Sequence, residues 1–185
     1  MRLHISTIRC QKCFFIVFLF SLSAIAQPQV VNFKQLQQFL PQGNFGNYSA
    51  EQPTGETSTM MGFSTSWAQV NYHSSTDSSA VSARITDLLN IPSYMSIAPP
   101  VNSDSIRSTP VGYEKTVMYK DLKIMETYHG TTHRAKLQSY FANRFLLEIN
   151  GENVSDTNVL YGLLDKINLD GLRALIQPSQ INNGK

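Results

Sequence analysis

Two histidines four residues apart, His129 and His133, form a pair whose spacing suggests chemistry. A His-x-x-x-His spacing places both imidazoles on one face of a helix, where they can bind zinc. Glu126 is the nearest carboxylate that could act as a third ligand, so these three residues are the candidates for a metal-dependent hydrolase. The intervening segment, Gly130-Thr131-Thr132, is poor helix material. The sequence therefore favours exposed loop histidines, and we expect no metal site.

A serine hydrolase is the second catalytic possibility. Serine is abundant, but the sequence contains no Gly-x-Ser-x-Gly motif, which presents the nucleophile in α/β-hydrolases. It also lacks a glycine-rich loop of the kind that binds phosphate groups. We expect no catalytic residue and no cofactor. A metal-dependent or serine hydrolase that uses the region of His129 and His133 is the alternative function.

Two charged residues, Asp87 and Arg144, lie in runs that otherwise predict strands. Asp87 continues the apolar face of its run, and we expect its carboxylate to accept backbone hydrogen bonds in the turn that follows. The alternation of the second run places Arg144 on the face opposite Phe145, where we expect a surface ion pair with Glu148.

The first 26 residues have the features of a secretory signal peptide. Three basic residues precede the apolar run 14–22, and Ala24-Ile25-Ala26 offers a cleavage site of small residues. The apolar run is shorter than the roughly 20 residues that a spanning helix needs. The sequence therefore predicts an exported protein, periplasmic or secreted, with no membrane span after cleavage.

Cleavage would also change the cysteine content and the charge. Cys10 and Cys13 both lie in the signal region, so the mature chain would form no disulfide. Three of the 15 Lys and Arg residues would be lost, which leaves 12 against 13 Asp and Glu. A net charge near −1 argues against nucleic acid as a partner. The expected partner is an unidentified protein or small ligand in the cell envelope.

Alternating apolar residues predict three antiparallel strand pairs. In the central pair, Ala135–Phe141 and Arg144–Asn150, we expect Phe145, Leu147 and Ile149 to face the core. The other two pairs are 64–73 with 81–86 and 111–118 with 122–128.

Helical spacing of apolar residues predicts helices at both ends, with Asn32 and Ser155 as N-caps, and a further short helix within 88–98. The expected fold class is α+β, an antiparallel sheet of about five to seven strands with N-terminal and C-terminal helices packed on it. Residues 27–178 are expected to form a single domain, and 179–185 a flexible tail.

Five segments carry a resemblance to known proteins. They are Leu36-Gln-Gln-Phe-Leu-Pro41, Ser66-Trp-Ala68 with Tyr72, Arg84-Ile-Thr-Asp87, Asn143-Arg-Phe-Leu-Leu-Glu-Ile149 and Ile167-Asn-Leu-Asp-Gly-Leu172. Together they resemble a group of small exported bacterial proteins of unknown function. The order of strands and helices is also weakly similar to the PsbP-like fold of extrinsic photosystem subunits. The resemblance implies export and one compact domain, and it brings no activity with it.

Export without a recognisable catalytic constellation predicts a non-enzymatic module that binds a protein or a small ligand, or an accessory subunit of an envelope complex. Binding would use one face of the sheet or the segment 88–109.

Overall fold

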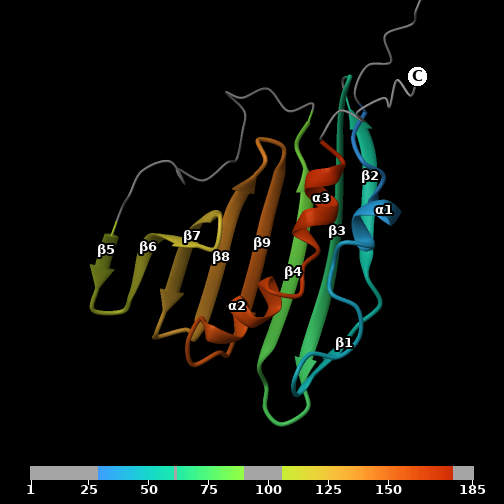
Figure 1. Cartoon of the computed structure of the whole chain (residues 1–185). Coiled ribbons are helices and arrows are strands. Elements are labelled where there is room, and N and C mark those ends of the chain that lie inside the picture. Colours follow the sequence, from blue (N-terminus) through green and yellow to red (C-terminus); the bar gives the residue numbers. More distant parts are fainter. Residues whose placement is uncertain (1–28, 61, 90–105, 177–185) are drawn as a thin grey trace, which may run out of the picture.

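The architecture is a single twisted antiparallel sheet with three short helices against it (Figure 1). The computed structural model describes residues 29–60, 62–89 and 106–176. Its strands are β1 (Tyr48–Ala50), β2 (Thr54–Met60), β3 (Phe63–Ser74), β4 (Ala80–Asp87), β5 (Ile106–Thr109), β6 (Gly112–Tyr119), β7 (Leu122–His129), β8 (Arg134–Phe141) and β9 (Phe145–Glu152). The helices are α1 (Phe33–Gln37), α2 (Asn158–Leu164) and α3 (Leu169–Ala174).

The nine strands run in the order β1-β3-β4-β9-β8-β7-β6-β5, and β2 also pairs with β3. Both β1 and β2 lie on the outer edge of the long strand β3, β2 along its first half and β1 at its end. The central strands are therefore β9 and β8, and β9 pairs on its other side with β4, which comes from a distant part of the chain.

The expected α+β fold is wrong, because the described chain is mostly β. It has nine strands instead of five to seven, and its helices contain only 5, 7 and 6 residues. The sequence pattern missed β1, β2 and β5. β1 contains only 3 residues, too few to show alternation. Neither β2 nor β5 has a buried face: six residues of β2 and all four of β5 are exposed. Without a buried face there is no apolar alternation to mark a strand.

The predicted central hairpin is confirmed. β8 pairs with β9 in a register that places Leu137 opposite Ile149, and the turn residues Ala142 and Asn143 both have positive φ. Phe145, Leu147 and Ile149 are at most 2% exposed. The two other predicted pairs form as β3 with β4 and as β6 with β7.

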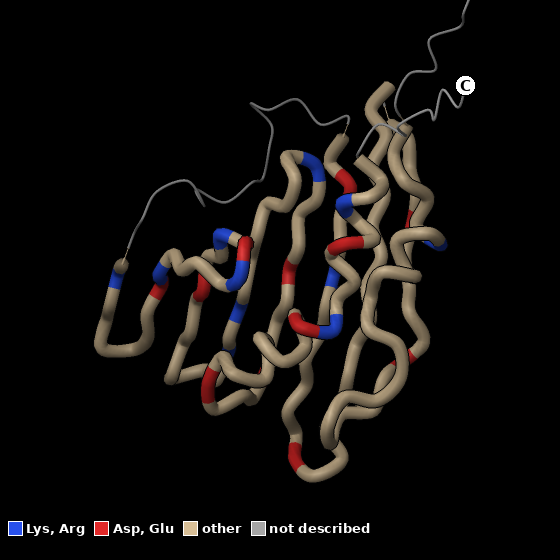
Figure 2. The backbone as a smooth tube through the Cα atoms, viewed as in Figure 1, with Lys and Arg blue, Asp and Glu red and all other residues tan. Residues whose placement is uncertain are grey.

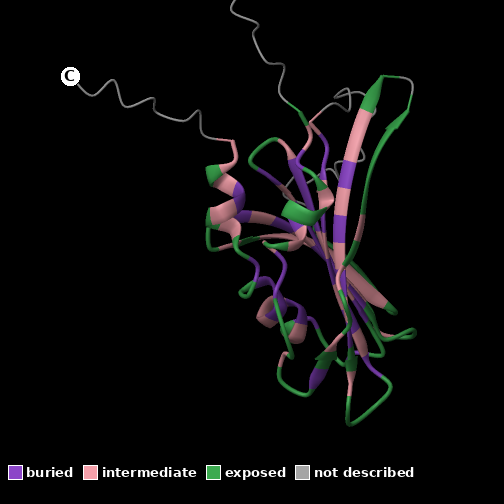
Figure 3. Cartoon of the chain, turned by 90° about the vertical axis from the view of Figure 1, so that its right-hand side faces the viewer, coloured by how far each residue is buried: buried purple, intermediate pink, exposed green. Residues whose placement is uncertain are grey.

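All three helices lie on one side of the sheet (Figure 3). Leucines from each of them pack with strand residues in one buried core. The apolar alternation of β3, β4, β8 and β9 faces this side, so the burial of apolar surface fixes which face each strand presents. We call the opposite side, whose residues alternate with the core residues along the strands, the open face.

The two predicted helix caps have different outcomes. Asn32 caps α1 as expected, and its side chain accepts a hydrogen bond from the backbone N–H of Lys34 at 2.9 Å. Ser155 is not a cap, because α2 begins three residues later with Thr157 in the cap position. Asp156 accepts a bond from the N–H of Asn158 there. Most of the predicted helix at 88–98, the signal region 1–26 and the tail 179–185 lie outside the described residues.

The partner predicted for Arg144 is wrong. Its guanidinium binds Asp87 rather than Glu148, at 2.9 Å and 2.7 Å. The role expected for Asp87 is confirmed, since its carboxylate accepts a hydrogen bond from the backbone N–H of Leu89 at 3.0 Å. The short β8–β9 turn carries Arg144 to the end of β4, which no spacing along the chain could indicate.

Candidate functional site

The three candidate metal ligands do not converge. Glu126 is 3% exposed and faces the helices, whereas His129 is exposed at the end of β7 on the open face. His133 lies in the β7–β8 turn with φ of 48°. Among the described residues, no group of three or more His, Cys, Asp or Glu side chains could hold a metal ion. The structure therefore does not bring Glu126, His129 and His133 together, as the alternative hydrolase site would require.

Glu126 instead joins β6 and β7 to α2. Its carboxylate accepts hydrogen bonds from Tyr113 at 2.5 Å, Tyr161 at 2.6 Å and Thr157 at 2.9 Å, and Lys115 lies 3.4 Å away. Burial acts to raise the pKa of Glu126, but the three hydrogen bonds and the lysine charge outweigh it and lower that pKa. Burial and the bond to Glu126 raise the pKa of Tyr161, which keeps this tyrosine protonated as a donor. These contacts connect β6 and β7 to α2, so the role of the cluster is structural.

The open face is the surface of the sheet on which polar groups gather. Strand register aligns one row of side chains across six strands: Asn71, Ser82, Asn150, Lys136, Thr127 and Glu114. With strands spaced by about 4.8 Å, this row is roughly 24 Å long. Basic and acidic residues are interspersed over the strands, without a cluster of one sign (Figure 2).

Three shallow hollows follow this row and share lining residues, so they form one continuous trough. The first, at the β1 side, contains Asn71 and Ser82, and it shares Asn150 with the second. The second shares Thr127 and His129 with the third. We call this continuous depression the trough.

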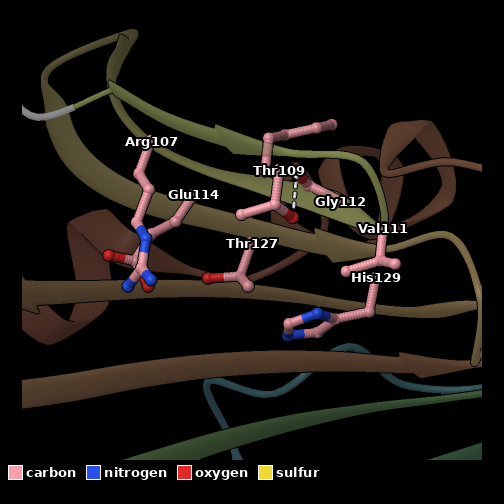
Figure 4. A pocket seen from close by; sticks show the side chains of 8 residues that line it. Arg107, Thr109, Val111, Gly112, Glu114, Thr127 and His129 are labelled. Atoms are coloured by element: carbon pink, nitrogen blue, oxygen red, sulfur yellow. Dashed lines mark hydrogen bonds between the residues drawn. The ribbon is translucent and has the colours of Figure 1, made fainter.

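Figure 4 shows the third hollow, at the β5 end of the trough. Arg107 and Glu114 stand opposite each other on β5 and β6, and Thr127 and His129 follow along β7. The hydroxyl of Thr109 donates to the carbonyl of Gly112 at 3.1 Å and closes the β5–β6 turn. This end of the trough therefore offers both charges, one imidazole and one hydroxyl.

A hydrogen-bonded chain fixes the side chains on the β3 side of the trough. Gln69 donates to Asn71 at 2.7 Å, and Asn71 donates to Glu51 at 2.9 Å. The other oxygen of Glu51 lies 2.9 Å from the imidazole of His73. The hydrogen bonds from Asn71 and then His73 lower the pKa of Glu51. This flank is ordered by its own side chains.

A second set of contacts fixes the β8 side. One oxygen of Glu148 accepts a hydrogen bond from Gln138 at 2.9 Å and an ion pair from Lys136 at 3.0 Å. Gln138 is only 9% exposed, although it lies on the open face. The carboxylate of Glu148 is therefore already bound by Gln138 and Lys136 of β8.

Between these flanks, β4 and β9 present polar groups that are not paired. Within the described residues, the side chains of Ser82, Arg84 and Asn150 make no hydrogen bond or ion pair. Arg84 lies over the indole ring of Trp67, with its guanidinium carbon 4.2 Å from the ring centroid. Its Nε is buried and has no hydrogen-bond partner in the part of the chain that the structure describes. Sequence reasoning missed this centre, because polar residues that alternate along a strand look like an ordinary solvated face.

Comparisons with family models, curated proteins and solved structures returned no match for the chain. In the described part of the chain, no helix has the length and apolar character needed to cross a membrane.

Proposed function

We propose that this protein is an exported, non-enzymatic binding module whose trough holds an oligosaccharide. One observation carries the proposal: unpaired polar side chains on β4 and β9 lie between two flanks whose side chains are already fixed by hydrogen bonds. Such an arrangement leaves free donors and acceptors where a ligand would lie and limits the ordering cost on binding.

The chemistry of the trough matches a hydroxyl-rich ligand. Amide side chains such as Asn71 and Asn150 both donate and accept hydrogen bonds, as sugar hydroxyls do. The hydroxyls of Ser82 and Thr127 have the same dual character. The row's length of roughly 24 Å suits a short extended chain better than a single small molecule.

Support for export comes from the basic start, the short apolar run and the Ala24-Ile25-Ala26 site. Support for a non-enzymatic role comes from the separation of Glu126, His129 and His133 over two faces and a turn.

Titration of isotope-labelled protein with a panel of neutral and acidic oligosaccharides, followed by NMR, tests the proposal. We expect saturable shifts of the side-chain amides of Asn71 and Asn150. Asn150→Ala should weaken binding about tenfold, through loss of hydrogen bonds at the junction of two hollows. Asn158→Ala, an exposed asparagine on α2, is the matched control and should bind as the wild type does. Absence of saturable shifts, or shifts confined to the helix side, would overturn the proposal.

A further inference from the structure

One cation of the open face, Arg84 on β4, has surroundings that differ from those of the other cations nearby. Lys136 is paired with Glu148, and Arg134 lies 3.5 Å from Glu152. Arg84 stands directly opposite Glu148 on the neighbouring strand, yet Glu148 binds Lys136 and Gln138 instead. Among the described residues, Arg84 thus has no carboxylate partner, although Glu148 stands opposite it on the neighbouring strand.

Trp67 holds the guanidinium of Arg84 in place. The two side chains are stacked, with 4.2 Å between the guanidinium carbon and the ring centroid. Cation–π contact fixes an otherwise mobile arginine without using its N–H groups. The Nε is buried, so the donors that a ligand can reach are those of the two terminal nitrogens. The half-buried position of Arg84 reduces competition from water and strengthens a charge-assisted hydrogen bond.

Arg84 lies beside the trough, on the same face of β4 as the lining residue Ser82. We infer that Arg84 binds a carboxylate of the ligand, so the saccharide in the trough is an acidic one that contains uronic acid residues. This inference rests on the proposed function and names its ligand class. A guanidinium matches a carboxylate in planar, two-pronged geometry. Arg84 and Lys136 are positively charged and Glu148 is negatively charged, so the three side chains together have a net charge of +1. This charge favours the binding of one carboxylate at this point.

The trough itself selects against a densely charged polyanion. Glu51, Glu114 and Glu152 line it and would repel closely spaced phosphates. They would instead accept hydrogen bonds from hydroxyl groups. A ligand with isolated carboxylates among many hydroxyls satisfies both parts of the surface.

Calorimetric titration with trimers of galacturonic acid and of mannuronic acid tests the inference. Each acid trimer is compared with the same trimer after methyl esterification, which removes the charge and keeps the hydroxyls. At least one acid trimer should bind the wild type about tenfold or more tightly than its ester. In Arg84→Met the preference should fall below about twofold, and Arg84→Lys should restore part of it.

Arg173→Met is the matched control, because it removes an arginine of α3 that also lies over an aromatic ring, that of Phe141, but outside the trough. It should keep the preference for the acid trimer. An NMR signal from the Arg84 Nε–H that moves with the acid trimer and not with the ester gives a second reading that needs no variant.

Equal affinity for acid and ester, or a preference unchanged in Arg84→Met, would overturn the inference and leave the proposed function standing. If neither these trimers nor the neutral oligosaccharides bind, the proposed function itself fails and the inference fails with it.

Discussion

Asp87 and Arg144 lie 57 residues apart in the sequence and form a two-pronged ion pair at the edge of the core. The carboxylate of Asp87 is completely buried, and it also accepts a hydrogen bond from the N–H of Val31 at 2.7 Å. Arg144 donates in addition to the carbonyl of Gln29 at 2.9 Å. One ion pair thus ties the segment before α1 to the ends of β4 and β9.

Loss of the guanidinium should destabilise the fold strongly. We expect Arg144→Met to lower the free energy of unfolding by about 3–5 kcal/mol, because the buried carboxylate of Asp87 loses its countercharge. Arg134→Met, in the exposed pair with Glu152, should cost less than about 1 kcal/mol. Urea unfolding of the two variants measures both values. A similar loss of unfolding free energy in both variants would show that the buried pair of Asp87 and Arg144 stabilises the fold no more than the exposed pair does.

The Glu126 cluster makes stability depend on pH. A carboxyl group whose pKa is lower in the folded than in the unfolded state contributes stability above its unfolded pKa and loses it as the pH falls through the folded pKa. Wild-type stability should therefore drop from about pH 5 downward. Glu126→Gln should be less stable at neutral pH, and its stability should fall less with acid. An unchanged pH profile of stability in Glu126→Gln would contradict the assignment.

Five of the six strands that the sequence predicted have buried residues on one face, and the sixth, β6, is half-buried along most of its length. In β4 the alternation of Val81, Ala83 and Ile85 with polar residues is strict, because one side packs on the core and the other does not. β2 could not be found in this way, since the hydroxyl groups of Thr57 and Thr59 bond to serines of β3 and almost nothing apolar is buried. β2 therefore forms a strand because it pairs with β3, although its own sequence pattern predicts a loop.

The candidate site could not be predicted for a different reason. Ser82 and Asn150 are 68 positions apart in the sequence, and only the pairing of β4 with β9 places them opposite each other. Arg84 looked like an ordinary exposed residue, because the stacking on Trp67 and the commitment of Glu148 to β8 are tertiary features. The sequence did indicate which face these residues occupy.

Export has a direct test in the organism that makes the protein. We expect the mature chain to begin at Gln27, because Ala24 and Ala26 supply the small residues that signal peptidase needs. Intact mass and N-terminal sequencing of the isolated protein measure this. A double variant with Ala24→Phe and Ala26→Phe should keep the leader. Residues 1–26 found intact on a membrane-bound wild-type protein would refute the cleaved signal.

A close backbone approach at Gly55 gives the last prediction, because this glycine lies where α1 packs on the β2–β3 pair. A Cβ added at Gly55 would lie 2.5 Å from the carbonyl oxygen of Trp67 and 2.9 Å from the ring of Phe33. Neither can yield easily, since one is backbone and the other is the helix contact, so Gly55→Ala should cost about 1–3 kcal/mol of unfolding free energy.

Gly130→Ala is the matched control, because the nearest atom to its added Cβ is 3.6 Å away, an ordinary contact distance. It should change stability by no more than about 0.5 kcal/mol. Thermal and urea unfolding of the two variants measure the difference. If Gly55→Ala is as stable as Gly130→Ala, α1 does not pack on β2 as closely as the structure places it.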